Sequence, residues 1–193
     1  WSYPSVSATA RDSDGHGSHT AGTAAGNIVL NAVIDAPTRQ FTADISGVAP
    51  HANIIAYAAC CAGSALAAAR DQALLDGVDV VNYSIGSAGP TGDFWQSSEA
   101  LQWLALREAG VFVATSAGNA GPGPATMGSP GTMPWMTTVG ANPQSRFFEG
   151  TVVLGDGNMY SGASITAGTD ELPLVDAATA TVDGDDRCLP GTL

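Results

Sequence analysis

The segment between residues 52 and 115 constrains the fold most, because strand-like and helix-like patterns alternate along it. Three stretches have the apolar, β-branched character of buried strands: Ala52–Cys60, Val78–Ile85 and Val111–Thr115. Two helix-like stretches separate them: residues 65–75 and 94–109, closed by Gly77 and Gly110. This order requires right-handed crossovers and a parallel sheet covered on both faces. The sequence therefore predicts an α/β fold.

Two helix starts are visible in the sequence. A short helix is predicted from about His16, with Asp14 near its N-terminus and Gly26-Asn27 as its end. Because this helix is rich in Gly and Ala, its propensity is low, and we expect it to pack closely inside a larger core. Ser64 is predicted to cap the helix that begins at Ala65.

The chain changes character after about Asn142. Val152-Val153-Leu154, then Gly155-Asp156-Gly157, then Met159-Tyr160 predict a β-hairpin. Beyond Ser161 the chain is polar and acidic without a helical period. We expect a boundary near residues 160–175, with one domain over residues 1–160 and the start of a second over 161–193.

Charge and hydropathy exclude several classes of partner. The net charge is −12 with only six Lys and Arg, too few to neutralise a phosphate backbone, so nucleic acid is not expected as a partner. No apolar run approaches the ~20 residues of a membrane-spanning helix, and no membrane association is expected. The odd number of cysteines, three, leaves their pairing and the compartment open. No cofactor motif is present, and the oligomeric state is left open.

Four motifs occur in a fixed order along residues 12–141. They are Asp14-Gly15-His16-Gly17-Ser18-His19, Gly47-Val48-Ala49-Pro50, Val80-Val81-Asn82-Tyr83-Ser84-Ile85-Gly86 and Ser116-Ala117-Gly118-Asn119. Each is weak alone, but together they resemble the subtilase family of serine peptidases. The resemblance implies an incomplete three-layer, parallel-sheet subtilisin-like fold and a serine endopeptidase that cleaves protein or peptide substrates by a Ser-His-Asp mechanism.

The resemblance assigns two catalytic residues. His16 would be the imidazole that takes the serine proton and returns it to the leaving amine, a role that suits a group titrating near neutral pH. His19, three positions on, is expected to face the helix packing. Asn119 would donate its amide to the oxyanion of the tetrahedral intermediate. The alternative for Asn119 is an ordinary turn asparagine, which composition alone favours.

Four further residues are predicted to bind substrate: Ser84, Ile85, Gly86 and Gly118. An extended peptide pairs with an enzyme as an added strand, and Gly86 has no side chain to block that approach. The alternative is that this stretch is simply the end of a buried strand.

The aspartate and the serine of the triad are expected outside this chain. Asp12 and Asp14 lie too near His16 in sequence to orient its ring, and first-turn carboxylates stabilise a helix N-terminus. No serine occurs in a Gly-Thr-Ser-Met motif, so Ser116, Ser129 and Ser164 are not expected to be the nucleophile. The chain alone is therefore expected to be inactive.

The end of the sequence resembles the opening of a protease-associated domain. The residues that carry this resemblance are Leu172-Pro173-Leu174-Val175 and residues 187–193. Such a domain is inserted between the oxyanion asparagine and the nucleophile in many plant and bacterial subtilases. Because subtilases of this type are typically exported, the resemblance implies a secreted protein.

The sequence leaves two alternatives. His16, His19 and His51 could belong to a metal site, but the spacing of the first two is not the His-x-x-x-His of a zinc peptidase helix, and no metal is expected. A catalytically inactive pseudoprotease or interaction module is the second alternative, because two triad members are not found in the chain.

Overall fold

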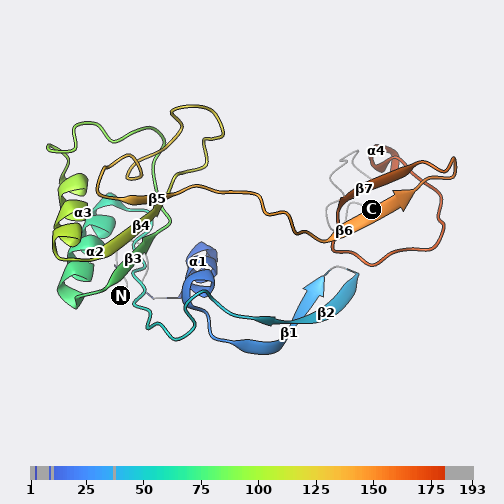
Figure 1. Cartoon of the computed structure of the whole chain (residues 1–193), viewed down its shortest axis with the longest axis horizontal. Helices are drawn as coiled ribbons and strands as arrows, with labels where there is room; N and C mark the ends of the chain where they lie inside the picture. Colours follow the sequence, from blue (N-terminus) through green and yellow to red (C-terminus); the bar gives the residue numbers. More distant parts are fainter. Residues whose placement is uncertain (1–2, 4–8, 10, 37, 181–193) are drawn as a thin grey trace. The chain divides into compact units, whose positions relative to one another are not determined.

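The computed structural model describes residues 3, 9, 11–36 and 38–180 (Figure 1). The chain divides into two compact units. The first contains residues 1–32 and 44–144, and the second contains residues 33–43 and 145–193. No helix in the described part of the chain has the length and apolar character needed to cross a membrane.

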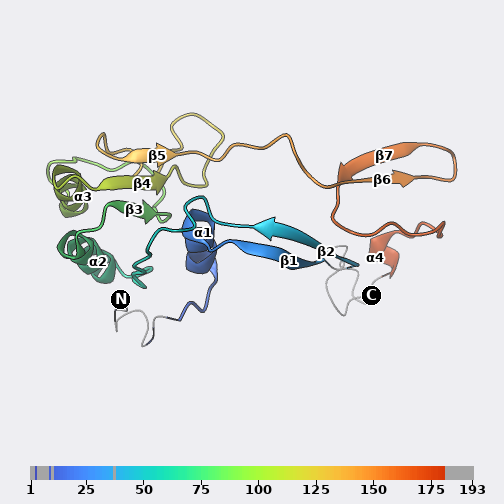
Figure 2. The same ribbon diagram turned by 60° about the horizontal axis from the view of Figure 1, so that its bottom comes forward.

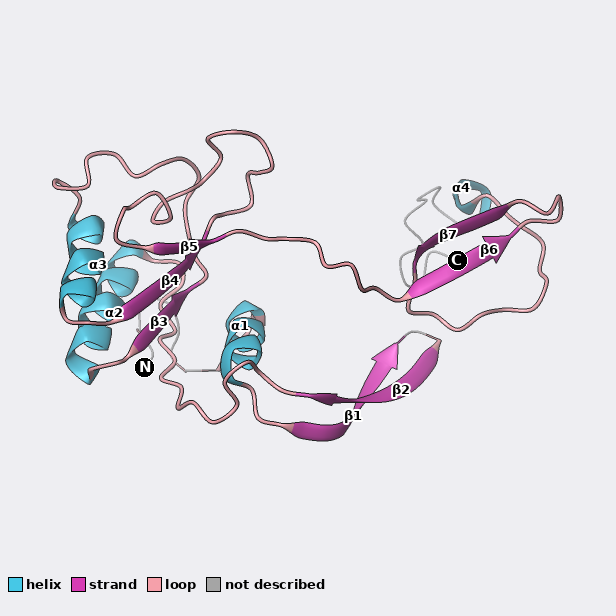
Figure 3. Ribbon diagram, in the orientation of Figure 1, coloured by secondary structure: helices cyan, strands magenta, loops and turns pink. Residues whose placement is uncertain are grey.

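A parallel sheet organises the first unit. β3 (Val80–Tyr83), β4 (Phe112–Ser116) and β5 (Thr137–Val139) lie in the order β3-β4-β5, and both pairings are parallel (Figure 3). Val80 lies opposite Phe112, and Ala114 lies opposite Thr137. The parallel α/β arrangement predicted from the alternating pattern is confirmed.

Two helices accompany these strands: α2 (Gly63–Asp76) precedes β3, and α3 (Ser98–Glu108) connects β3 to β4. α2 ends at Gly77, whose φ of 66° is the left-handed conformation that glycine adopts at little cost. α3 is capped by Ser97, whose hydroxyl accepts a hydrogen bond from the Ala100 N–H at 3.3 Å. The predicted cap at Ser64 is wrong, because α2 begins one residue before Ser64 and its N-cap is Ala62.

The core of the first unit lies between the sheet and these two helices. Figure 2 shows α2 and α3 together on one side of the strands, with α1 (His16–Ala25) on the other. The largest fully buried side chains include Trp103, Leu106, Val113 and Met133. Complete burial of one such side chain contributes about 1.5–3 kcal/mol relative to its exposure, so these residues dominate the packing.

Residues 52–60 do not form the predicted strand. The segment runs irregularly between Pro50 and α2, with a single bridge at Ala58. Its apolar composition suits a strand, but backbone N–H and C=O groups need a ladder partner. In the described residues β3 is paired only with β4, so no neighbouring strand orders this segment.

The structure contains a hairpin that the sequence did not predict. β1 (Val29–Ala36) and β2 (Arg39–Ile45) form a two-stranded sheet. Half-buried residues alternate with exposed ones at positions 32, 34 and 36 of β1 and 41 and 43 of β2, and the other residues of both strands are exposed. The residues near its tip, 33–43, belong to the second unit.

The second unit contains the predicted hairpin. β6 (Glu149–Val153) and β7 (Met159–Ala163) pair antiparallel, which confirms that prediction. Phe41 and Phe148 pack with ring centroids 5.3 Å apart, and the Ala167 N–H donates to the Thr38 hydroxyl at 2.7 Å. A short helix, α4 (Ala177–Ala180), follows, and residues 187–193 lie outside the described part of the chain.

Candidate active site

His16 is the first residue of α1, and its side chain is exposed. The helix begins after Gly15, whose φ of 99° is in the left-handed region that favours glycine. The His16 N–H donates to an Asp14 carboxylate oxygen at 3.3 Å. The Asp-Gly-His sequence therefore turns the chain sharply and leaves the imidazole at the exposed start of the helix.

Asp12 holds the start of α1 in place. Its Oδ1 accepts hydrogen bonds from the N–H groups of Asp14 and Gly15 at 3.0 and 2.8 Å. Its Oδ2 accepts from both the N–H and the hydroxyl of Ser18 at 2.7 Å. These bonds, led by the one from Gly15, hold the pKa of Asp12 well below its usual range. Asp12 thus ties the loop before His16 to the first turn of the helix.

This network predicts how stability depends on pH. The pKa of Asp12 is lower in the folded state than the ~3.9 of a free aspartate, so its stabilising contribution is complete above that value. The contribution is lost as the pH falls through the lower, folded-state pKa. In thermal unfolding followed by circular dichroism, Asp12→Ala should lower Tm by a constant amount above about pH 4, and the difference should shrink toward pH 2. A difference that does not change between pH 7 and pH 2 would contradict this role.

The other end of α1 is anchored through the backbone. The N–H groups of Gly47, Val48 and Ala49 donate to the carbonyls of Gly26, Thr23 and Ala24, respectively, at 2.9–3.0 Å. A Cβ atom at Gly47 would overlap the Gly26 nitrogen, which explains the glycine at this position. No residue of α1 is buried, so the expectation that this helix packs inside a core is wrong. Close backbone pairing with this segment anchors it instead.

A shallow pocket of about 270 Å³ lies between α1 and the end of β3. Its walls include His19, Thr20 and Thr23 of α1, with Asn82 and Ser84 opposite. His19 is exposed at this pocket, so the expectation that it faces the helix packing is wrong. Positions 16, 20 and 23 are four and three residues apart, so His16 lies on the same helix face as Thr20 and Thr23. Its own side chain is not one of the pocket walls.

The residues after β3 are free to pair with another chain. Ser84 immediately follows β3, and its hydroxyl accepts a hydrogen bond from the Asn82 amide at 3.1 Å. The backbones of Ile85 and Gly86 make no hydrogen bond among the described residues. A Cβ atom at Gly86 would lie 2.7 Å from the Ser129 carbonyl oxygen, so this position requires glycine.

Asn119 lies in the loop that follows β4, and its side chain is exposed. Gly118 precedes it with a φ of 91°, a left-handed conformation that a residue with a Cβ atom adopts only with strain. β3 and β4 are parallel neighbours, so their carboxyl ends lie at the same edge of the sheet. Ser84–Gly86 and Gly118-Asn119 therefore follow adjacent strand ends. Ligands of open α/β sheets bind beyond this edge.

Residues 128–131 form hydrogen bonds with the segments that follow both strand ends, and the sequence analysis did not assign them to the site. The Gly128 N–H donates to the Ala117 carbonyl at 3.1 Å, and the Ser87 N–H donates to the Ser129 carbonyl at 2.9 Å. The Ser129 hydroxyl accepts a hydrogen bond from Thr91 at 2.7 Å. The Gly-Ser-Pro-Gly sequence at 128–131 was the available signal, because two glycines and a proline mark a tight backbone approach.

Not all of the candidate residues are in contact with one another. No hydrogen bond or salt bridge joins His16 to Asn119 in the described structure. His51 is exposed in the loop before residues 52–60. The described residues include no group of three or more His, Cys, Asp and Glu side chains placed to hold a metal ion, so the alternative metal site gains no support.

Comparison with known proteins identifies the family. Residues 1–179 match the subtilase family model. The chain is 38% identical over 191 residues to the Subtilisin-like protease SBT1.4 of Arabidopsis thaliana, covering 95% of this chain and 24% of that protein. It is 41% identical over 163 residues to SBT1.5 of the same plant, covering 82% of this chain and 20% of that protein.

Among solved structures, the prenylagaramide maturation protease PagA matches 49% of this chain and 35% of its own, with a TM-score of 0.35 and 22% identity. Ser84–Gly86 and Gly118-Asn119 lie at the edge of the parallel sheet where α/β proteins commonly bind ligands. The family match covers most of the chain, and the chain belongs to the subtilase family. It spans about a quarter of the length of the Arabidopsis relatives.

Proposed function

We propose that this chain is the part of a serine endopeptidase that carries the general base and the oxyanion donor. The observation that supports it most is that His16 begins the helix whose following residues His19, Thr20 and Thr23 line the pocket opposite Asn82 and Ser84. An imidazole there can take a proton from a nucleophile that enters beside the pocket and return it to the leaving amine.

Asn119 and Gly118 have a separate task in this proposal. The exposed amide of Asn119 donates to the oxyanion that forms when the nucleophile attacks, and the left-handed Gly118 turns the chain to present it. The free backbones of Ile85 and Gly86 pair with an extended peptide. The nucleophilic serine and the aspartate that orients His16 come from outside residues 1–193.

We also propose that the protein is secreted and that a protease-associated domain begins near residue 161. The resemblance of residues 172–175 to the opening of such a domain supports this proposal. The complete reading frame tests this proposal, because it should encode an export signal and further protease-associated sequence. A cytosolic location in cell fractionation would contradict secretion.

The function is tested on the protein expressed from its complete reading frame. Cleavage of a chromogenic peptide should be abolished by an organophosphate that acylates active-site serines and should be insensitive to a metal chelator, because no step uses a metal. The heat-denatured protein is the control for spontaneous hydrolysis. Cleavage that the chelator abolishes and the organophosphate spares would overturn the proposal, and a native protein without cleavage would favour a pseudoprotease.

A further inference from the structure

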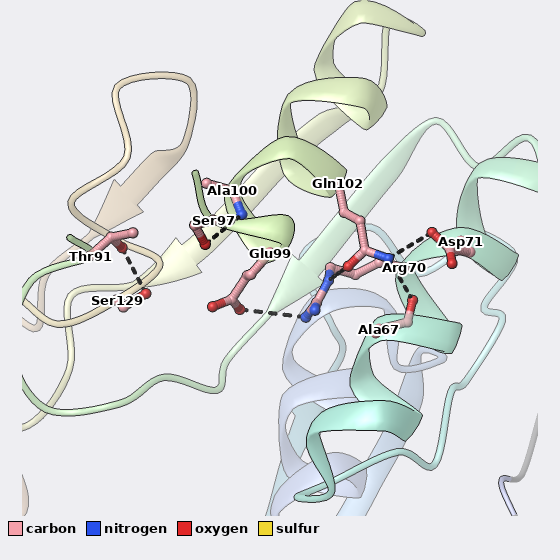
Figure 4. Close-up of polar contacts among 9 residues, drawn as sticks. All are labelled: Ala67, Arg70, Asp71, Thr91, Ser97, Glu99, Ala100, Gln102 and Ser129. Carbon is pink, nitrogen blue, oxygen red and sulfur yellow. Dashed lines mark hydrogen bonds and ion pairs between the residues drawn. The ribbon is translucent and has the colours of Figure 1, made fainter. Parts of the chain in front are cut away.

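A buried arginine joins the two helices behind the sheet (Figure 4). Arg70 of α2 is 8% exposed, and its Nε donates to the side-chain oxygen of Gln102 in α3 at 2.8 Å. Its Nη1 pairs with Glu99 at 3.4 Å. The amide nitrogen of Gln102 donates in turn to the Asp71 carboxylate at 2.8 Å and to the Ala67 carbonyl at 3.3 Å. The side chain of Arg70 is thus fixed from several directions.

The free energy of unfolding does not by itself explain a buried arginine here. Replacement of a buried ion pair by apolar side chains of similar volume is often neutral or stabilising. A methionine at position 70 would fill much of the same space between α2 and α3. What the guanidinium adds is geometry, because its planar set of donors fixes the distance and direction of each partner.

Two aromatic rings, those of Trp103 and Tyr83, lie in contact between the Arg70 guanidinium and the end of β3. The Arg70 guanidinium lies over the Trp103 ring, 5.4 Å from its centroid. Trp103 is 1% exposed and meets Tyr83 edge-on at a centroid distance of 4.7 Å. Burial is the main cause that raises the pKa of Tyr83, so its phenol stays neutral in this packing. Tyr83 is the last residue of β3, and Ser84 follows it directly.

We infer that Arg70 is a positioning residue: acting through Trp103 and Tyr83, it fixes the Ser84–Gly86 segment in the position that pairs with an extended peptide. The inference rests on the proposed function. It concerns binding of residues remote from the cleaved bond and leaves the proton transfer at His16 unchanged.

The variant that tests this inference is Arg70→Met, studied in the protein expressed from its complete reading frame. Arg70→Met should raise KM for an extended peptide about tenfold, below the roughly 100-fold that a 1 Å misplacement can cost. The kcat of a single-residue ester should be unchanged, because an ester does not pair with the Ser84–Gly86 segment. Calorimetry with an uncleavable reduced-amide peptide should show the same loss of affinity, which makes the test independent of turnover.

Arg107→Met is the matched control. Arg107, in the last turn of α3, also lies near an aromatic ring, that of Phe112, at 5.9 Å, and donates to the Val111 carbonyl at 2.9 Å. Both contacts are at the start of β4, the end of the strand away from the candidate site. Arg107→Met should therefore leave peptide KM and affinity unchanged. Arg70→Lys, which keeps the charge without the planar donors, should lie between wild type and Arg70→Met, and near-ultraviolet circular dichroism verifies the fold.

Three results would overturn the inference. They are a lower Tm in Arg70→Met with unchanged peptide binding, an equal loss for peptide and ester, and the same peptide defect in Arg107→Met. If wild type binds the uncleavable peptide but cleaves neither substrate, the proposed function fails while the inference is still judged from binding.

Discussion

Substitution of His16 by alanine should abolish peptide cleavage by the complete enzyme. Without an imidazole, the serine hydroxyl stays protonated and is a weak nucleophile. The expected fall in kcat is about 10⁶-fold, a magnitude that subtilisin itself supplies for loss of its histidine. The measurement is steady-state cleavage of a chromogenic peptide by purified wild type and variant, with circular dichroism to verify that both are folded.

The matched control is His51→Ala. His51 is also exposed and lies in the same unit, but it follows the Gly47–Pro50 segment and is not part of α1. Its replacement should leave kcat and KM unchanged. If His51→Ala and His16→Ala lose activity equally, or if His16→Ala retains wild-type turnover, His16 is not the general base.

Two strands of the sheet and the helices beside them could be predicted because their signals are local, but β5 was not predicted. Gly77 marks the end of α2 in the sequence, whereas the helix expected from residue 94 begins only at Ser98, after its cap at Ser97. The end of β3 is less well marked. The apolar run continues to Ile85, but the ladder with β4 ends at Tyr83. Only the partner strand determines where pairing stops.

The segment 52–60 shows the limit of such reasoning. Its apolar residues satisfy the pattern of a buried strand, yet a strand exists only when a neighbour supplies hydrogen bonds along its length. Composition does not specify that neighbour. The hairpin of β1 and β2 is the opposite case. The two strands pair with each other, but most of their side chains are exposed, so apolar and polar residues do not alternate regularly along them in the sequence.

The candidate site was predictable where one motif carries the chemistry. The Asp14–His19 motif gave the start of α1 and the candidate base, and the structure adds that Asp12 secures this start. The role of residues 128–131 could not be predicted, because it depends on contacts with segments far away in the sequence. A Cβ atom at Gly128 would overlap the Ser87 carbonyl oxygen, a constraint that appears only when both loops are placed in space.

The second large effect is expected for Asn119→Ala in the complete enzyme. Its amide is proposed to meet the oxyanion only after attack, so the substitution should lower kcat by roughly 10²–10³-fold, a range that subtilisin itself supplies. KM should hardly change, since an interaction made only in the transition state lowers kcat and kcat/KM equally. Steady-state kinetics with one peptide over a range of concentrations measures both constants.

Asn142→Ala is the control for this experiment. Asn142 is an exposed asparagine of the same unit that follows β5 and belongs to none of the candidate segments, so its replacement should leave both constants unchanged. The double variant His16→Ala/Asn119→Ala should lose less than the product of the two single losses, because both residues act on the same attack step. A higher KM at unchanged kcat in Asn119→Ala would instead make Asn119 a substrate-binding residue. The oxyanion donor would then have to lie elsewhere.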